Sequence, residues 1–217
     1  MLATAGCGGA KKDKASAAPP ASTTTQASAN GCSKVGEPAP KGAQHLPKPK
    51  LRLDRDQTWT ATVTTNCGAF TITLDVHDSP KTSSSFAWLA RKGFYDGLTF
   101  HRIAPGFVIQ GGDPLGDGTG GPGYGIVEPP PGNVQYTHGV VAMAKTATDP
   151  DGASGSQFFV VTGTDAGLPA QYALLGNVTD GLDVVDRIGA LELQTSDPQG
   201  GPPIDPVVID SVEIAGG

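Results

Sequence analysis

Apolar and polar residues alternate through two short segments that follow the first quarter of the chain. Threonine alternates with Trp, Ala and Val over residues 59–65, and Phe, Ile and Leu share one face of residues 69–74. A repeat of two residues is typical of a strand with one buried face, and the turn residues Asn66 to Gly68 lie between the segments. The pattern therefore predicts a β-hairpin.

The spacing of apolar residues then changes to that of a helix. Ser79 is a suitable N-cap, Pro80 suits the first helical position, and the basic residues and glycine at 91–93 end the segment. We therefore predict a helix that begins at Pro80. A second, shorter helix is predicted over residues 180–188, where Leu, Val and Ile recur at helical spacing.

Six further apolar segments bring the predicted strands to eight. The two helices do not alternate with the strands, which disfavours a parallel sheet. The sequence thus indicates a mainly β fold, a closed eight-stranded antiparallel barrel capped by two helices. The six segments are residues 99–103, 107–110, 139–144, 157–161, 174–179 and 206–214.

Residues 1–50 differ in composition from the rest of the chain. Residues 11–26 contain no large apolar side chain, so this stretch cannot bury enough surface to offset the entropy of ordering. We predict a disordered N-terminal tail or tether over residues 1–50 and one folded domain over residues 51–217.

The charges are divided in the same way. Residues 1–50 carry seven lysines against two acidic residues, a net charge of +5, whereas residues 51–217 carry 8 basic and 19 acidic residues, a net charge of −11. An acidic domain argues against nucleic-acid binding. The basic tail suits an anionic membrane surface, and a soluble linker explains its composition equally well.

The residues Thr4-Ala5-Gly6-Cys7 resemble the end of a bacterial lipoprotein signal, in which small residues precede an acylated cysteine. Thr4 stands where leucine is usual, and most of the charged and apolar parts of such a signal are missing. Either the true start lies upstream and Cys7 is the lipidation site, or Cys7 is an ordinary thiol. The first reading predicts an extracytoplasmic, membrane-tethered protein, and the second a cytoplasmic one.

Acylation of Cys7 would leave Cys32 and Cys67 as a pair. An even remainder in an exported protein suggests a disulfide, which would tie the tail to the predicted hairpin. The alternative is two unpaired cysteines, with Cys67 as a small residue in a turn.

Other chemistry finds little support in the sequence. Residues 116–121 match a dinucleotide-binding glycine pattern, but Pro122 follows where a helix should begin, so we interpret them as a surface loop. The four histidines are too scattered for a metal site, and no serine-hydrolase elbow is present. We expect neither a metal nor a cofactor.

Residues 100–113 form the most informative stretch, Phe-His-Arg-Ile-Ala-Pro-Gly-Phe-Val-Ile-Gln-Gly-Gly-Asp. They place Arg102, Phe107 and Gln110 on two short strands joined by a Pro-Gly turn. A guanidinium among apolar residues needs a partner. From composition alone, Arg102 either pairs with a carboxylate or belongs to an active site.

A second informative stretch is Gly-Ser-Gln-Phe-Phe-Val-Val, residues 155–161. Strand alternation places one of Phe158 and Phe159 in the core and the other outward. An outward phenylalanine beside Phe107 would make an exposed apolar pocket with polar neighbours, which indicates a binding site.

These two stretches resemble the signature of cyclophilins, which are peptidyl-prolyl cis/trans isomerases, and the resemblance runs in order through residues 59–214. It implies an eight-stranded barrel capped by two helices, and an enzyme that accelerates rotation about X–Pro bonds without a cofactor. The partners it implies are proline-containing peptides and unfolded or exported proteins. We expect a monomer.

The resemblance also assigns roles to single positions. It implies that Arg102 is the catalytic arginine, that Gln110 orients this arginine and the substrate backbone, and that His101 lies beside the substrate. The matched positions that line the substrate pocket and groove are Phe107, Val108, Ala144, Gln157, Phe159, Leu168 and Tyr172.

Some positions depart from the best-known eukaryotic members. Lys145 stands in place of Asn, Gly167 in place of Trp, and Tyr172 in place of a pocket His. Tyr172 keeps an aromatic wall and a hydrogen-bonding tip, so we expect activity to survive. The loss of the Trp argues against tight binding of cyclosporin.

Two other functions stay open. The domain could bind proline-containing segments as a chaperone or scaffold without catalysis, although Arg102 would then have no purpose. An unrelated enzyme, such as a hydrolase, could use a similar barrel, but no motif supplies a nucleophile and base for it.

Overall fold

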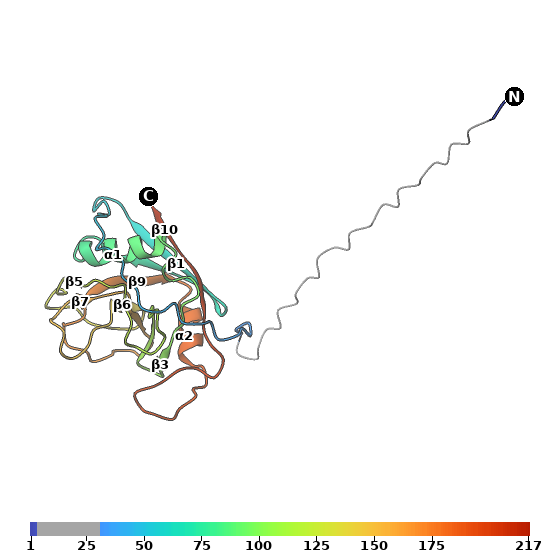
Figure 1. Cartoon of the computed structure of the whole chain (residues 1–217). Helices are drawn as coiled ribbons and strands as arrows, with labels where there is room; N and C mark the ends of the chain where they lie inside the picture. Colours follow the sequence, from blue (N-terminus) through green and yellow to red (C-terminus); the bar gives the residue numbers. More distant parts are fainter. Residues whose placement is uncertain (4–30) are drawn as a thin grey trace.

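The computed structural model describes residues 1–3 and 31–217, and Cys7 lies outside this part of the chain. Ten strands and two helices are present in it (Figure 1). Their bounds are β1 Trp59–Thr65, β2 Gly68–Leu74, α1 Pro80–Arg91, β3 Arg102–Ala104, β4 Val108–Gly111, β5 Ile126–Val127, β6 Val140–Met143, β7 Ala153–Ser154, β8 Phe158–Val161, β9 Leu174–Asp180, α2 Leu182–Gly189 and β10 Ile209–Gly216.

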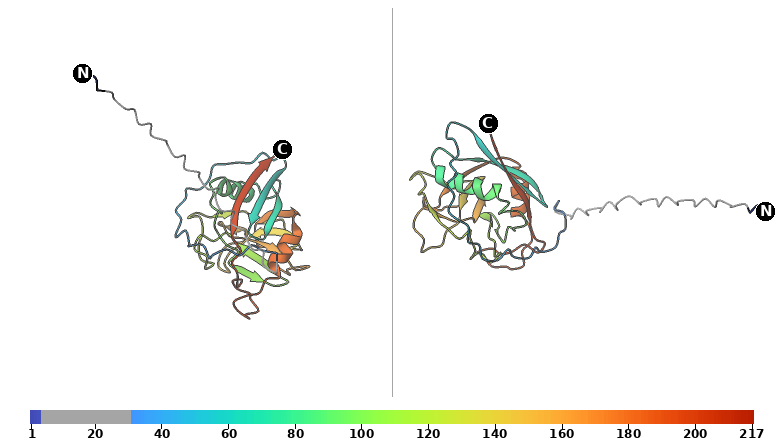
Figure 2. Two further views of the ribbon diagram at one scale, coloured as in Figure 1. Left: turned by 90° about the vertical axis from the view of Figure 1, so that its right-hand side faces the viewer. Right: turned by 45° about the horizontal axis from the view of Figure 1, so that its top comes forward.

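The main sheet contains the eight strands that the sequence predicted, but it is not a closed barrel. Its strand order is β10-β1-β2-β9-β6-β8-β4-β3, so β10 and β3 are edge strands of an open, strongly curled sheet, and β10 lies beside β1 and β2 in Figure 2. Two isolated bridges lie near these edges but do not pair β3 with β10: Thr99, before β3, pairs with Val208, before β10, and Ile103 of β3 pairs with Gly201. The prediction of closure is wrong because the segment of residues 202–206 holds three prolines, which lack the N–H groups that a continuous ladder needs.

Helix α1 begins at Pro80 as predicted, but Ser79 does not cap it through its side chain. Instead the buried carboxylate of Glu128 accepts hydrogen bonds from the backbone N–H groups of Lys81, at 3.2 Å, and Thr82, at 2.7 Å. A carboxylate at this end of a helix also complements the helix dipole.

Helix α2 begins two residues later than predicted, at Leu182. Strand β9 continues through Asp180, and Gly181 then takes a left-handed conformation with φ of 72°. A Cβ atom at Gly181 would lie 2.4 Å from the carbonyl oxygen of Ala69, so only glycine fits the approach of α2 to the hairpin.

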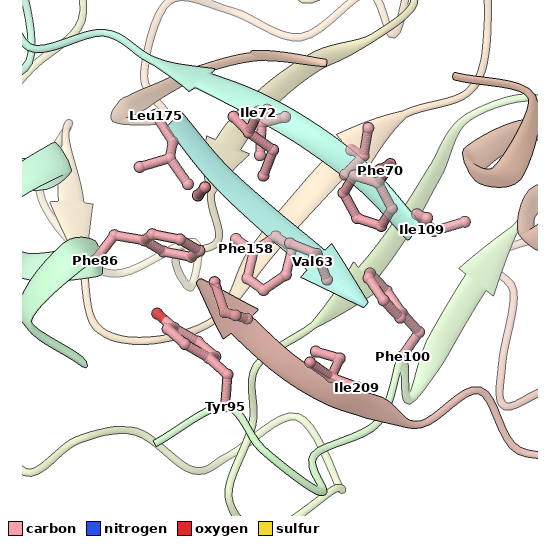
Figure 3. Close-up of a cluster of buried hydrophobic side chains, with 14 of the residues drawn as sticks. Val63, Phe70, Ile72, Phe86, Tyr95, Phe100, Ile109, Phe158, Leu175 and Ile209 are labelled. Carbon is pink, nitrogen blue, oxygen red and sulfur yellow. The ribbon is translucent and has the colours of Figure 1, made fainter. Parts of the chain in front are cut away.

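Apolar side chains gather on both faces of the sheet. The larger cluster lies between the sheet and α1, where the ring of Phe158 contacts those of Phe86, Tyr95 and Phe100 at centroid distances of 5.5, 5.9 and 5.8 Å (Figure 3). The smaller cluster lies on the opposite face and contains Phe159. Strand alternation therefore separates the two phenylalanines as predicted.

Residues 31–50, which we call the strap, are not the disordered segment that the sequence predicted. The strap lies along the domain (blue in Figure 1), and its side chain Cys32 is buried and joined to Cys67 by a disulfide. Beyond it, the N–H of Leu53 donates to the hydroxyl of Ser84 at 3.0 Å. The folded unit therefore begins well before residue 51.

Within residues 1–3 and 31–217, no helix combines the length and apolar character needed to cross a bilayer. The same residues hold no group of three or more His, Cys, Asp or Glu side chains placed to bind a metal ion.

Candidate active site

Arg102 begins strand β3, opposite Gln110 of the antiparallel strand β4. Its guanidinium donates from Nη1 to Oε1 of Gln110 at 3.1 Å and from Nε to the carbonyl oxygen of Gln199 at 2.9 Å. No carboxylate lies within ion-pair distance of Arg102 among the described residues. The ion-pair alternative is therefore wrong, and neutral oxygens fix the orientation of the guanidinium.

Gln110 is held in turn by Gln157. The Nε2 of Gln110 donates to Oε1 of Gln157 at 3.0 Å, and the Nε2 of Gln157 donates to the carbonyl oxygens of Gly118 and Gly120, both at 2.9 Å. Arg102, Gln110 and Gln157 thus form one chain of hydrogen bonds, which we call the amide relay. It begins in the glycine-rich loop and ends at the guanidinium.

The smaller apolar cluster adjoins Arg102 on the face of the sheet opposite α1. Phe159 and Val108 are buried there on the neighbouring strands β8 and β4, and the ring of Phe107 lies 6.0 Å from Cζ of Arg102. Half-buried side chains that pack on this cluster include Phe107, Ala144, Leu168 and Tyr172. The structure therefore brings together the side chains that the sequence assigned to the substrate pocket.

Tyr172 packs against this cluster. Its ring meets that of Phe159 edge to face, with centroids 5.5 Å apart, and Nζ of Lys145 lies 5.6 Å from its centroid. The hydroxyl of Tyr136 donates to the carbonyl of Tyr172 at 2.6 Å and accepts from its N–H at 3.0 Å. Burial raises the pKa of Tyr136 to about 12, so this clamp stays protonated in the physiological range.

The guanidinium of Arg102 provides a fixed positive charge beside the apolar cluster. Burial lowers the pKa of Arg102, but an arginine stays charged at physiological pH. Burial also lowers the pKa of His101, and Arg102 lowers it further, against the opposing effect of Asp113. The neutral imidazole of His101 lines a cavity of about 390 Å³ together with Arg102 and Gln110.

A second cavity, also of about 390 Å³, extends from Gln110 and Gln157 to Ala144, Lys145 and Asp149. The N–H of Ala144 donates to the carbonyl of Gln157 at 2.9 Å, so the segment at Ala144 is held directly beside a member of the amide relay. All seven residues that the sequence placed in the pocket or groove thus lie on one side of the sheet.

The sequence did not predict several groups of the site, three backbone carbonyls and one hydroxyl. The carbonyls of Gly118, Gly120 and Gln199 are backbone groups, and residue identity gives no sign of them. Tyr136 acts through its hydroxyl on the backbone of a residue 36 positions away, which no local pattern reveals. The run of glycines at residues 116–121 was visible in the sequence, and glycines leave backbone carbonyls accessible. However, the only motif that these residues matched was a dinucleotide-binding pattern.

Comparison with protein families shows which family the chain belongs to. Residues 60–214 match the family model described as "Cyclophilin type peptidyl-prolyl cis-trans isomerase/CLD". The chain belongs to the cyclophilin family. As in the many curated cyclophilins named for this reaction, its activity is peptidyl-prolyl cis-trans isomerisation.

Similar cyclophilins include peptidyl-prolyl cis-trans isomerase B of Bacillus subtilis (strain 168), 49% identical over 107 residues, which cover 48% of this chain and 72% of that protein. The probable peptidyl-prolyl cis-trans isomerase A of Mycobacterium leprae (strain TN) is 37% identical over 177 residues, covering 73% of this chain and 93% of that protein. A cyclophilin of Cryptosporidium parvum, crystallised in the presence of the dipeptide Ala-Pro, superposes with a TM-score of 0.64 at 30% identity, covering 72% of this chain and 98% of that one.

Proposed function

We propose that this cyclophilin isomerises X–Pro bonds of protein substrates by aiming the guanidinium of Arg102 at the proline nitrogen. Amide resonance sets a barrier of about 18–20 kcal/mol to rotation of the peptide bond. In the twisted state the proline nitrogen becomes pyramidal and regains its lone pair. A donor aimed at that lone pair stabilises the twisted state more than either planar state, which is the requirement for catalysis.

The anchoring of Arg102 is the observation that carries this proposal. A guanidinium has five N–H groups, and Gln110 and Gln199 take one each. The others have no acceptor within the described part of the chain and stay available to a substrate. Because the acceptors are neutral, the full positive charge also remains available for the developing lone pair.

The pocket supplies the second requirement, a grip on the proline ring. Phe107, Phe159 and Leu168 offer apolar contact to the ring, while Tyr172 closes one side. With the ring held still, the acyl side of the substrate rotates past Arg102. Proximity and orientation of this kind contribute to the rate without any covalent step.

Catalysis and mere binding are separated by one assay. We expect catalytic amounts of the wild-type protein to increase the exchange rate between cis and trans signals of an Ala-Pro peptide in NMR spectra. A binding module without catalysis would shift or broaden the peptide signals but leave the exchange rate at the uncatalysed value. Unchanged exchange at saturating peptide would therefore contradict the proposal.

The N-terminal sequence supports a tethered form that acts on exported proteins. Cys7 follows small residues as in lipoproteins, and the disulfide of Cys32 and Cys67 suits an oxidising compartment. We expect the protein purified from native membranes to have an intact mass that exceeds the peptide mass by that of acyl chains on Cys7, and a Cys7→Ser variant to lose the addition. An unmodified Cys7 in protein from the same source would contradict the tether.

A further inference from the structure

The strap packs against the loop of residues 113–123, which we call the groove loop, and bonds to both of its ends. The N–H of Lys41 donates to the carbonyl of Pro114 at 2.9 Å, and the N–H of Leu46 donates to the carbonyl of Pro122 at 2.9 Å. Both prolines are buried. These two hydrogen bonds therefore hold the groove loop near both of its ends.

The carbonyls that hold the amide relay lie between these two hydrogen bonds. Gly118 and Gly120 both accept from the side chain of Gln157, which holds Gln110 and through it Arg102. Every link from the groove loop to the guanidinium is a hydrogen bond of 3.1 Å or less. A shift of the groove loop is thus passed directly to the catalytic donor.

The groove loop needs such support because its own sequence gives it little rigidity. Five of its eleven residues are glycine, the residue that loses the most conformational freedom on folding. Inside the loop the carboxylate of Asp113 accepts from the N–H groups of Leu115, at 2.9 Å, and Gly118, at 2.6 Å. Asp117 likewise accepts from the N–H and hydroxyl of Thr119. Beyond Gly120, which accepts from Gln157, the loop is held by the hydrogen bond from the strap to Pro122.

The strap is itself firmly attached to the domain. At its start, next to the disulfide, the N–H of Ser33 donates to the carbonyl of Asn66 at 2.7 Å. In its middle, Nζ of Lys41 donates to the carbonyls of Gly93, at 3.2 Å, and Phe94, at 2.9 Å, just beyond helix α1. The strap can therefore act as a brace between the hairpin, the end of α1 and the groove loop.

We propose that the strap is a positioning element of the active site, which fixes the amide relay, and so Arg102, through the groove loop. It precedes the part of the chain that matches the family model, which begins at residue 60. Residues Ala43 and Gln44 of the strap also line a cavity of about 640 Å³ that continues along Ala144 and Lys145, so the strap forms part of the groove wall. The inference rests on the proposed role of Arg102.

Two substitutions loosen the strap without touching the relay. Gly123 has φ of 89°, and a Cβ there would lie 2.5 Å from the carbonyl oxygen of Gln44, so Gly123→Ala forces the strap and groove loop apart. Lys41→Met removes the two hydrogen bonds of the amine and keeps an unbranched side chain. We expect kcat/KM to fall about tenfold for Gly123→Ala and about threefold for Lys41→Met, since small displacements of a positioned group carry such costs.

Matched controls separate positioning from general damage. Lys48→Met changes an exposed lysine of the strap that makes no hydrogen bond within the described residues, and Gly97→Ala introduces left-handed strain (φ of 74°) where a Cβ meets no atom within 4 Å. Both should keep the wild-type kcat/KM. Lys41→Arg, which retains donors on a side chain of similar reach, should recover most of the loss in Lys41→Met.

The decisive readout is taken well below the melting temperature, where every variant that folds is fully folded. We expect the NMR signals of the Gln157 side-chain amide and of Arg102 Nε–H to move in Gly123→Ala and Lys41→Met but not in the controls. A lowered melting temperature with unchanged kcat/KM and unchanged Gln157 and Arg102 signals would overturn the inference. Absence of turnover in the wild type would instead contradict the proposed function, and the same NMR signals would still decide whether the strap positions the relay.

Discussion

We expect Arg102→Ala to lower kcat/KM for a proline-containing test peptide by about 100- to 1000-fold, the usual cost of deleting one preorganised donor to a transition state. The fold should persist, because Arg102 lies half-buried on the edge strand β3. Its two acceptors, on Gln110 and Gln199, can then be reached by water. A protease-coupled assay gives the rate, and circular dichroism with thermal melting reports the fold.

Two further variants define what the guanidinium contributes. Arg52→Ala is the matched control, since Arg52 is exposed and donates a hydrogen bond to the carbonyl of its neighbour Leu51; this variant should retain full activity. Arg102→Lys keeps the charge, but a compact ammonium cannot bond to Gln110 and Gln199 and also reach the substrate as a planar fork does. We expect its rate to fall between those of Arg102→Ala and the wild type. Equal turnover by Arg102→Ala and the wild type would refute the assigned role of Arg102.

The local pattern of apolar, polar and turn residues was sufficient to predict most helices and strands of the fold. The hairpin of β1 and β2, the start of α1 and the opposite orientation of Phe158 and Phe159 all follow from periodicity and turn residues. The cap of α1 does not, because Glu128 reaches the helix from 46 or 47 positions along the chain. The prediction of a closed sheet was wrong for a similar reason, because closure depends on how residues 202–206 lie against β3 in space.

The placement of the candidate site was predictable where side chains form it and unpredictable where backbone groups do. The ordered motifs around Arg102 and Phe159 predicted that the two side chains lie near one another, and the structure brings both to the same side of the sheet, while their roles stay predictions. The carbonyls that fix the amide relay gave no signal, although the relay determines where the guanidinium points. The strap was missed because the composition of residues 11–26 was extended to residue 50, past Cys32 and Leu46, whose apolar side chains pack against the domain core.

Phe158→Ala and Phe159→Ala should separate stability from activity on one strand. Phe158 is fully buried against three aromatic rings, so its truncation should lower the free energy of unfolding by about 3–5 kcal/mol, measured by urea denaturation. Phe159 belongs to the smaller cluster, where we propose that the proline ring binds, so its truncation should lower kcat/KM about tenfold or more through lost contact with that ring. Its cost in stability should be smaller, because half-buried side chains around it can close over the gap.

Domains of this kind have a free energy of unfolding of only about 5–15 kcal/mol, so Phe158→Ala could unfold the protein and a milder variant is needed. Phe158→Leu keeps most of the buried volume and should give a smaller loss of stability at wild-type kcat/KM, which covers the case in which Phe158→Ala unfolds. Activity is measured at low temperature on protein shown to be folded by its near-ultraviolet circular dichroism. If the Phe158 variants lose kcat/KM while folded and Phe159→Ala does not, the pocket lies on the other face of β8 and the assignment of Phe159 is wrong. If instead Phe159→Ala loses kcat/KM and the folded Phe158 variants keep it, then Phe158 stabilises the core and Phe159, the next residue of β8, contacts the substrate.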